Sequence, residues 1–270
     1  MERRAIKLAE NTLVVSLPAK WCREQRIRKG SALSVVARGT ALQVAAVETI
    51  PQTLILRCPV DAVLAARLVG WAYKTGIDEL TLQEVPKTAM PRIKQELAAL
   101  SGYEIIRERN QTLNIRAVSR LNPQDLRVLE SRMWYILLEM VSAHLHGESR
   151  ELAIFEKDID ALSNACKRII AKQPMYGAET LNEYALIREL EKMGDVLLAA
   201  KASKQILRET QRLLLRLQSI RQTADREAMA QCLTFPWDEH AENTFIISLK
   251  DLASPVLALA IARQVQRIDS

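Results

Sequence analysis

The sequence has few of the residues that build thiolate metal sites, redox pairs and phosphate-binding loops. It contains four cysteines in 270 residues, and none has the C-x-x-C spacing that places two thiolates on one metal ion. Only eight glycines occur, and no glycine-rich phosphate loop is among them. We therefore expect reduced thiols, as in a cytoplasmic protein. The cysteines are Cys22, Cys58, Cys166 and Cys232.

The sequence also lacks enzyme signatures and membrane signals. No nucleophile is paired with a base and no dense cluster of metal ligands occurs, so we expect the chain not to be an enzyme. The apolar stretch at residues 13–17 is too short for an export signal, despite the basic start Met-Glu-Arg-Arg. The late apolar run at residues 252–262 contains Ser254 and Pro255 and is shorter than the ~20 residues of a bilayer span. We expect no membrane insertion.

Positive charge is concentrated near the N-terminus. Residues 1–50 contain nine Lys and Arg residues against four acidic residues, which accounts for +5 of the net charge of +6. We therefore expect any polyanionic partner to bind this end of the chain. A solvated basic surface without a partner is the alternative interpretation.

The residue patterns change near residues 50 and 120. With 49% apolar residues, a chain of this length can bury the cores of more than one domain. We predict a multidomain α+β protein with a β domain at residues 1–50, a small α/β domain at residues 51–120 and a helical bundle at residues 121–270.

The first region predicts a strand, a helical turn and a hairpin. Residues 12–17 are rich in β-forming side chains, Pro18 suits the first turn of a short helix, and Arg28-Lys-Gly30 is typical of a turn. Residues 33–36 and 42–47 flank Arg38-Gly39, as the strands of a hairpin would. Because so short a segment makes a poor independent core, we expect two copies to complete each other in a homodimer.

The second and third regions differ in periodicity. Strands at residues 54–58, 79–84, 103–107 and 112–116 with helices at residues 60–74 and 89–100 predict an α/β unit, interpreted as a spacer or sensing domain. After residue 122 we predict helices near residues 126–141 and 152–169, a third from about 179 past 216 with a bend near Gly194, and a last one at 238–267 capped by Asp238. Their spacing predicts bundle packing.

One N-terminal stretch points to a known family. Thr12-Leu-Val-Val-Ser-Leu-Pro-Ala-Lys-Trp21 followed by Ile27-Arg-Lys-Gly30 resembles the SpoVT/AbrB/MazE swapped-hairpin family. The resemblance implies an intertwined dimer whose basic residues face double-stranded DNA, with binding that weakens steeply as salt rises. A hairpin used only for dimerisation is the alternative. By position, the DNA-binding role falls to Arg3, Arg4, Lys7, Lys20 and Arg23.

Two pairs of carboxylates lie beside the apolar stripes of two bundle helices. Glu156 and Asp160 are four residues apart, as are Glu191 and Asp195, so each pair shares one helix face. Carboxylates near a bundle core must be neutralised, and a cation held by oxygen atoms from facing helices would do so. Ion pairs with Lys157, Arg188 and Lys192 are the alternative.

The same acids carry a second resemblance. Glu156-Lys-Asp-Ile-Asp-Ala-Leu162 and Ile187-Arg-Glu-Leu-Glu-Lys-Met-Gly-Asp-Val196 resemble the metal-binding helices of PhoU proteins, although many relatives have His where this chain has Val196. The resemblance implies a PhoU-like bundle that binds a divalent or ferric metal ion through Glu156, Asp160, Glu191 and Asp195. Gly194 costs about 1 kcal/mol inside a helix, so we expect close helix packing there or a close approach to the site.

Together, the two resemblances match the layout of archaeal-type phosphate uptake regulators. They imply a cytoplasmic DNA-binding transcriptional regulator of phosphate uptake, whose bundle senses a metal ion or a partner. The alternative is a PhoU-like interaction protein that modulates a phosphate transporter or sensor kinase without binding DNA.

Overall fold

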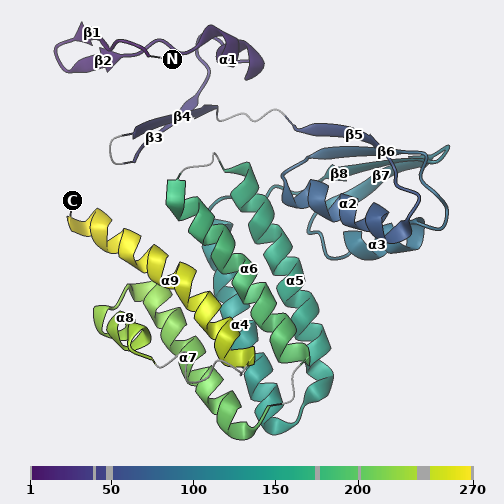
Figure 1. The fold of residues 1–270 in the computed structure, drawn as a ribbon. Coiled ribbons are helices and arrows are strands. Elements are labelled where there is room, and N and C mark those ends of the chain that lie inside the picture. The colour runs from purple at the N-terminus through teal and green to yellow at the C-terminus, as the bar shows by residue number, and fades with distance from the viewer. Residues whose placement is uncertain are drawn as a thin grey trace. The chain divides into compact units, whose positions relative to one another are not determined.

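The computed structural model describes residues 2–38, 41–46, 51–173, 177–199, 202–235 and 244–268. The chain divides into two compact units, Met1–Pro51 and Gln52–Ser270, and each is described by itself. Small N-terminal β hairpins, a mixed sheet with helices and a C-terminal bundle of about six helices confirm the predicted α+β class (Figure 1).

The first unit consists of two hairpins and a short helix. Strand β1 (Ile6–Ala9) pairs antiparallel with β2 (Thr12–Val14), helix α1 (Ala19–Glu24) follows, and β3 (Leu33–Arg38) pairs antiparallel with β4 (Ala41–Ala46). The predicted strand, helical turn and second hairpin are confirmed, whereas β1 was missed. A strand of four residues is too short to show a clear alternation of apolar and polar residues, and it is recognised only by its pairing with β2.

This first unit has no core of its own among its described residues. None of the side chains whose burial is described here is buried, and Leu8 and Leu13 are each 71% exposed. Each hairpin forms a separate two-stranded sheet. An isolated two-stranded hairpin is marginally stable in water, so this arrangement leaves apolar side chains and strand edges without a covering layer.

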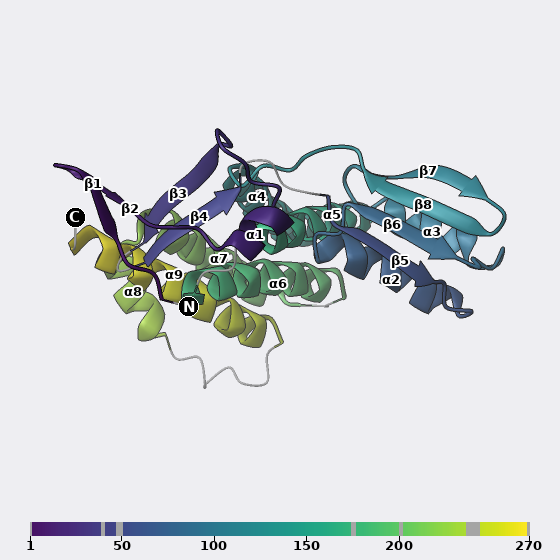
Figure 2. The ribbon, with the colours of Figure 1, turned by 90° about the horizontal axis from the view of Figure 1, so that it is seen from above.

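The second unit begins with a four-stranded mixed sheet. Its elements are β5 (Thr53–Arg57), α2 (Ala62–Lys74), β6 (Glu79–Gln83), α3 (Met90–Leu97), β7 (Tyr103–Arg109) and β8 (Thr112–Ala117). The strand order is β5-β6-β8-β7, with β5 and β6 parallel and the other pairs antiparallel. Figure 2 shows α2 and α3 on the same face of this sheet. All six elements were predicted, with boundaries shifted by up to three residues.

The sheet buries only the face that α2 and α3 cover. Leu80 and Leu82 of β6 and Leu113 and Ile115 of β8 alternate with less buried residues and pack against the two helices. Asp61 caps α2 by accepting a hydrogen bond from the Leu64 amide at 2.7 Å, so the helix begins at Ala62 instead of the predicted residue 60.

The remainder of the second unit is the helical bundle. It comprises α4 (Asp125–His146), α5 (Ser149–Lys172), α6 (Gly177–Ala199), α7 (Lys204–Thr223), α8 (Arg226–Leu233) and α9 (Thr244–Ile268). The stripes predicted for the first two helices are confirmed, since Met133 and Met140 of α4 and Ile159 and Cys166 of α5 are buried in one core.

The predicted third helix is wrong as a single element. Helix α6 ends at Ala199 and α7 begins at Lys204, with Ser203 as its N-cap accepting a hydrogen bond from the Ile206 amide at 3.3 Å. Helix α6 continues through Gly194 without interruption, and the predicted bend at that residue stays a prediction. The short helix α8, capped by Asp225, was missed. The predicted cap Asp238 lies outside the described residues.

Helix α9 has the length and the apolar composition of a membrane-spanning helix over Thr244–Gln264. Of its most apolar 18-residue window, 56% is buried inside the protein. It packs against α6 and α7 (Figure 1). The expectation of no membrane insertion stays a prediction.

Helix α5 joins the bundle to the sheet domain. Arg168, only 4% exposed, donates hydrogen bonds to the carbonyl oxygens of Tyr73 at 2.9 Å and Ile77 at 2.8 Å, and its guanidinium also bonds Asp78 at 2.7 Å. The same guanidinium lies 4.8 Å from the centroid of the Tyr73 ring. One buried cation thus fixes the end of α2 and the start of β6 to the bundle.

Candidate metal site and nucleic-acid interface

Three of the four predicted metal ligands meet between α5 and α6. Glu156 and Asp160 lie one turn apart on α5, and Asp195 faces them from α6. One carboxylate oxygen from each residue lies within 4.8 Å of the other two. Oxygen ligands bound at about 2.0–2.6 Å to a shared cation are separated by no more than about 4–5 Å, so one ion can contact all three.

Close packing of the two helices brings these acids together. A Cβ atom built at Gly194 would lie 3.1 Å from Cδ1 of Ile159, a buried residue that comes between the two α5 acids in the sequence. The absence of a side chain at position 194 therefore permits the observed approach of α6 to α5 next to Asp195. The close packing expected at Gly194 is confirmed.

The fourth predicted ligand, Glu191, is held by other partners. Its Oε2 atom accepts a hydrogen bond from the Ser163 hydroxyl at 2.7 Å and forms an ion pair with Lys167. Lys167 was not predicted from the sequence. It lies seven residues after Asp160, two turns along the same helix face, and that spacing could have identified it.

The cations proposed as ion-pair partners lie elsewhere. Arg188 pairs with Glu189, while Lys192 pairs with Asp251 at 2.6 Å and with Glu189 at 3.6 Å. Within the described ranges, neither these cations nor Lys157 forms an ion pair with Glu156, Asp160 or Asp195. The three converging carboxylates consequently lack a direct cationic partner among the described side chains.

Burial and mutual repulsion make Asp160 easier to protonate. Burial is the largest cause that raises the pKa of Asp160, to about 7, and the negative charges of Glu156, Glu191 and Asp195 raise it further against a smaller opposing effect of Lys167. Burial and then Glu191 also raise the pKa of Asp195. A bound cation would remove the cost of ionising both groups.

The donor atoms indicate which ions would fit. All three groups offer carboxylate oxygens, which suit hard cations such as Mg²⁺, Mn²⁺, Ca²⁺ or ferric iron. Val196, next to Asp195, contributes no imidazole and packs against the core instead. The side chains present therefore fit a hard divalent or ferric ion.

A second group of buried charges has a structural role. Arg221 donates two hydrogen bonds of 2.8 Å to Glu130 and one of 2.7 Å to Glu183, linking α4, α6 and α7. This group was not predicted, because its members lie on three helices. Arg127 of α4 also pairs with Glu130 at 3.3 Å and with Glu183 at 3.1 Å, so two cations neutralise two carboxylates. This balance distinguishes the group from the acids between α5 and α6.

The five residues predicted to bind DNA are not buried within their own unit. Arg3 and Arg4 precede β1, Lys7 lies on β1, and Lys20 and Arg23 lie on α1. Lys20 is 3.9 Å from Glu24, and at side-chain exposures of 83% and 56% such a pair contributes little. These cations remain available to a polyanion, but they come from three separate segments.

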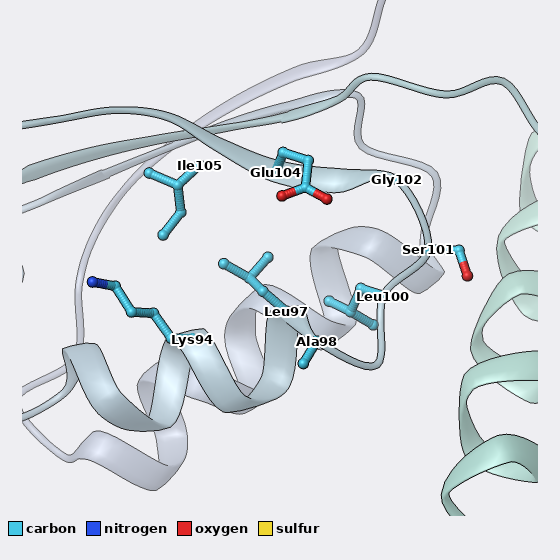
Figure 3. A pocket seen from close by; sticks show the side chains of 8 residues that line it. All are labelled: Lys94, Leu97, Ala98, Leu100, Ser101, Gly102, Glu104 and Ile105. Carbon is cyan, nitrogen blue, oxygen red and sulfur yellow. The ribbon is translucent and has the colours of Figure 1, made fainter.

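A hollow between α3 and β7 has little of the polar lining that a ligand-binding site needs. Figure 3 shows Leu97 of α3 and Ile105 of β7 pointing toward one another across it. Lys94, the cation that lines it, lies 3.9 Å from Glu108. This hollow of about 400 Å³ offers few convergent polar groups.

No protein-family model matches the chain, and no curated protein or solved structure is significantly similar to it.

Proposed function

We propose that the chain is a homodimeric DNA-binding transcriptional regulator. The first unit would bind DNA after two copies complete one another, and the bundle would hold a hard cation between α5 and α6. The resemblances to the swapped-hairpin and PhoU families make phosphate uptake the process that it would regulate.

The observation that carries this proposal is that the first unit is positively charged and leaves its apolar side chains exposed. Its two hairpins leave all their described side chains at least partly exposed, including Leu8 and Leu13. Residues 1–50 together carry most of the net charge of the chain. A second copy would cover the apolar side chains, because a unit of about 50 residues cannot bury enough surface alone. The exposed cations would then form one larger positive surface.

Salt dependence of DNA binding tests the proposal. We expect fluorescence anisotropy with duplex DNA to show binding at about 50 mM salt that weakens steeply by about 200 mM, because each neutralised phosphate releases counterions. The variant R3A/R4A/K7A should bind more weakly, and its salt slope should be shallower by about 0.9 for each phosphate that is no longer neutralised. It should remain dimeric in analytical ultracentrifugation.

A matched variant controls for charge alone. R132A/R150A/R212A removes the same three charges from exposed positions of the bundle and should bind DNA as the unmodified chain does. Equal reductions in affinity for both variants would show that net charge, not the first unit, drives binding. A dimer that shifts no duplex at low salt would instead favour a hairpin used as a dimer clasp in a PhoU-like interaction protein.

A further inference from the structure

A cleft of about 540 Å³ lies between α2, α3 and α5 and includes none of the three converging carboxylates. Small side chains, including Ala66 of α2, Ala98 at the end of α3 and Ala161 of α5, line part of it. This volume is in the range of about 300–1,000 Å³ that is typical of small-molecule sites. The cleft therefore has room for a ligand at the junction of the sheet domain and the bundle.

Three cations from three different helices line the cleft. They are Arg67 of α2, Arg92 of α3 and Lys157 of α5. In the part of the chain that the structure describes, none of them forms an ion pair, whereas Arg57, Lys94, Arg116 and Lys172 of the same region each pair with an acid. All three are exposed, and unpaired cations from several elements that line one concave surface are an arrangement that can bind an anion.

Two acids also line the cleft, and they limit which ligand fits. The Oε1 atom of Glu96 lies against Gly70 of α2, in the space that a Cβ atom at position 70 would occupy. Glu96 is thus directed onto the backbone of α2. Asp158 is half-buried beside Lys157 on α5 and would repel an anion. A ligand must carry enough negative charge to outweigh this repulsion.

We infer that this cleft binds a small molecule with two or more negative charges, such as a phosphate-bearing compound or a polycarboxylate. Arg67 and Arg92 bind its anionic groups in the manner of a guanidinium fork, and Lys157 contributes a point charge. The alanine side chains contact an apolar part of the ligand. The inference does not depend on DNA binding by the first unit.

The position of Lys157 links this cleft to the carboxylate site. Lys157 and Asp158 line the cleft, while Glu156 and Asp160 on the same turns of α5 meet Asp195 of α6. An anion in the cleft and a cation between α5 and α6 would therefore bind on two sides of one helix. If occupancy of one site shifts α5, each ligand changes the affinity of the other by the same factor.

Calorimetric titration of the full chain with inorganic phosphate, ATP and citrate tests the inference. At least one probe should bind at up to about millimolar concentration, and R67Q/R92Q should weaken that binding by about tenfold or more, because a charge-assisted hydrogen bond is worth about that factor. D158N should strengthen binding, because it removes the repulsive charge.

The N-terminal cations can bind the same probes, so the comparison between variants is decisive. R132Q/R212Q removes the same charge from exposed positions on α4 and α7 and should leave affinity unchanged. Circular dichroism confirms that each variant is folded. The inference is overturned if no probe binds, if the two double variants weaken binding equally, or if D158N weakens binding.

Discussion

Asp160 has a raised pKa, so its charge should depend on whether a cation is bound between α5 and α6. Its pKa of about 7 lies well above the ordinary value of 3.8, so the folded protein retains this proton over a pH range in which the unfolded chain has released it. Stability therefore decreases as pH rises from about 4 to about 7, and above that range the full cost of an ionised Asp160 is present.

We predict that D160N removes this dependence. In chelator, the variant should unfold at a higher temperature than the unmodified chain at pH 8 and at the same temperature at pH 4. Added Mn²⁺ or Mg²⁺ should reverse the order at pH 8 by stabilising only the unmodified chain. Differential scanning calorimetry measures both effects.

The exposed α5 acid Glu151 provides the control. E151Q should follow the unmodified chain at each pH, with and without metal. Metal-independent stability of the unmodified chain would contradict the proposed cation site, while an unchanged pH profile in D160N would contradict the assignment of the proton to Asp160.

Single residues were predictable where a local pattern revealed them. The four-residue spacing of the acids and their place beside apolar stripes identified Glu156, Asp160 and Asp195. Lys167 and Arg221 were not found, because a cation on a helix is usually solvated and its buried carboxylate partner lies on another helix.

At the scale of elements, α5 has three roles on two faces, because Lys157 and Arg168 lie eleven residues, or about three turns, apart. It presents two acids to α6, lines the cleft with Lys157, and holds the sheet domain through Arg168. Burial raises the pKa of Asp78, but hydrogen bonds from Lys172 and the Gln52 amide and the charge of Arg168 more than offset this, so its pKa lies below its usual value. The Asp78 carboxylate therefore stays ionised and continues to bind α5.

We predict that R168M loosens the sheet domain from the bundle. Two backbone carbonyls would lose their buried donor, and Asp78 would keep only Lys172 and the Gln52 amide, which should cost about 3 kcal/mol in the free energy of unfolding by urea. Hydrogen exchange should accelerate around residues 73–79 and stay slow in the core of α6. R132M, at an exposed position of α4, should change stability by less than about 0.5 kcal/mol. Unchanged protection around residues 73–79 in R168M would show that other contacts hold the two parts together.

Predicted element boundaries were accurate where Pro, Gly or capping residues mark them in the sequence. The sheet domain was predictable because Pro and Gly residues punctuate it, as at Gly76, where φ is +89° after α2. The break after Ala199 was missed because Leu197 to Ala202 contain no Gly or Pro and are mostly helix-forming residues. Only Ser203, as the cap of α7, marks the new helix.

The whole molecule combines two units that differ in how they are stabilised. Both hydrophobic cores lie in Gln52–Ser270, one under the sheet and one in the bundle. The second unit therefore has what it needs to fold alone, whereas the described residues of the first have no such core.

We predict that deleting residues 1–51 leaves a folded monomer. The remaining chain should keep its helical circular dichroism signal and its thermal transition, because no residue of either core is removed. Analytical ultracentrifugation should find a dimer for the full chain and a monomer after deletion. A deletion variant that still forms dimers would place the interface on the second unit.

The exposed hairpins also bear on the order of events during synthesis. A ribosome makes the first unit before any residue of either core exists, so Leu8 and Leu13 leave the exit tunnel with nothing in their own chain to cover them. Neighbouring ribosomes on one messenger RNA would present identical segments to one another at high local concentration. Assembly of the proposed dimer could therefore begin during translation, and chains made in isolation would need a chaperone for longer.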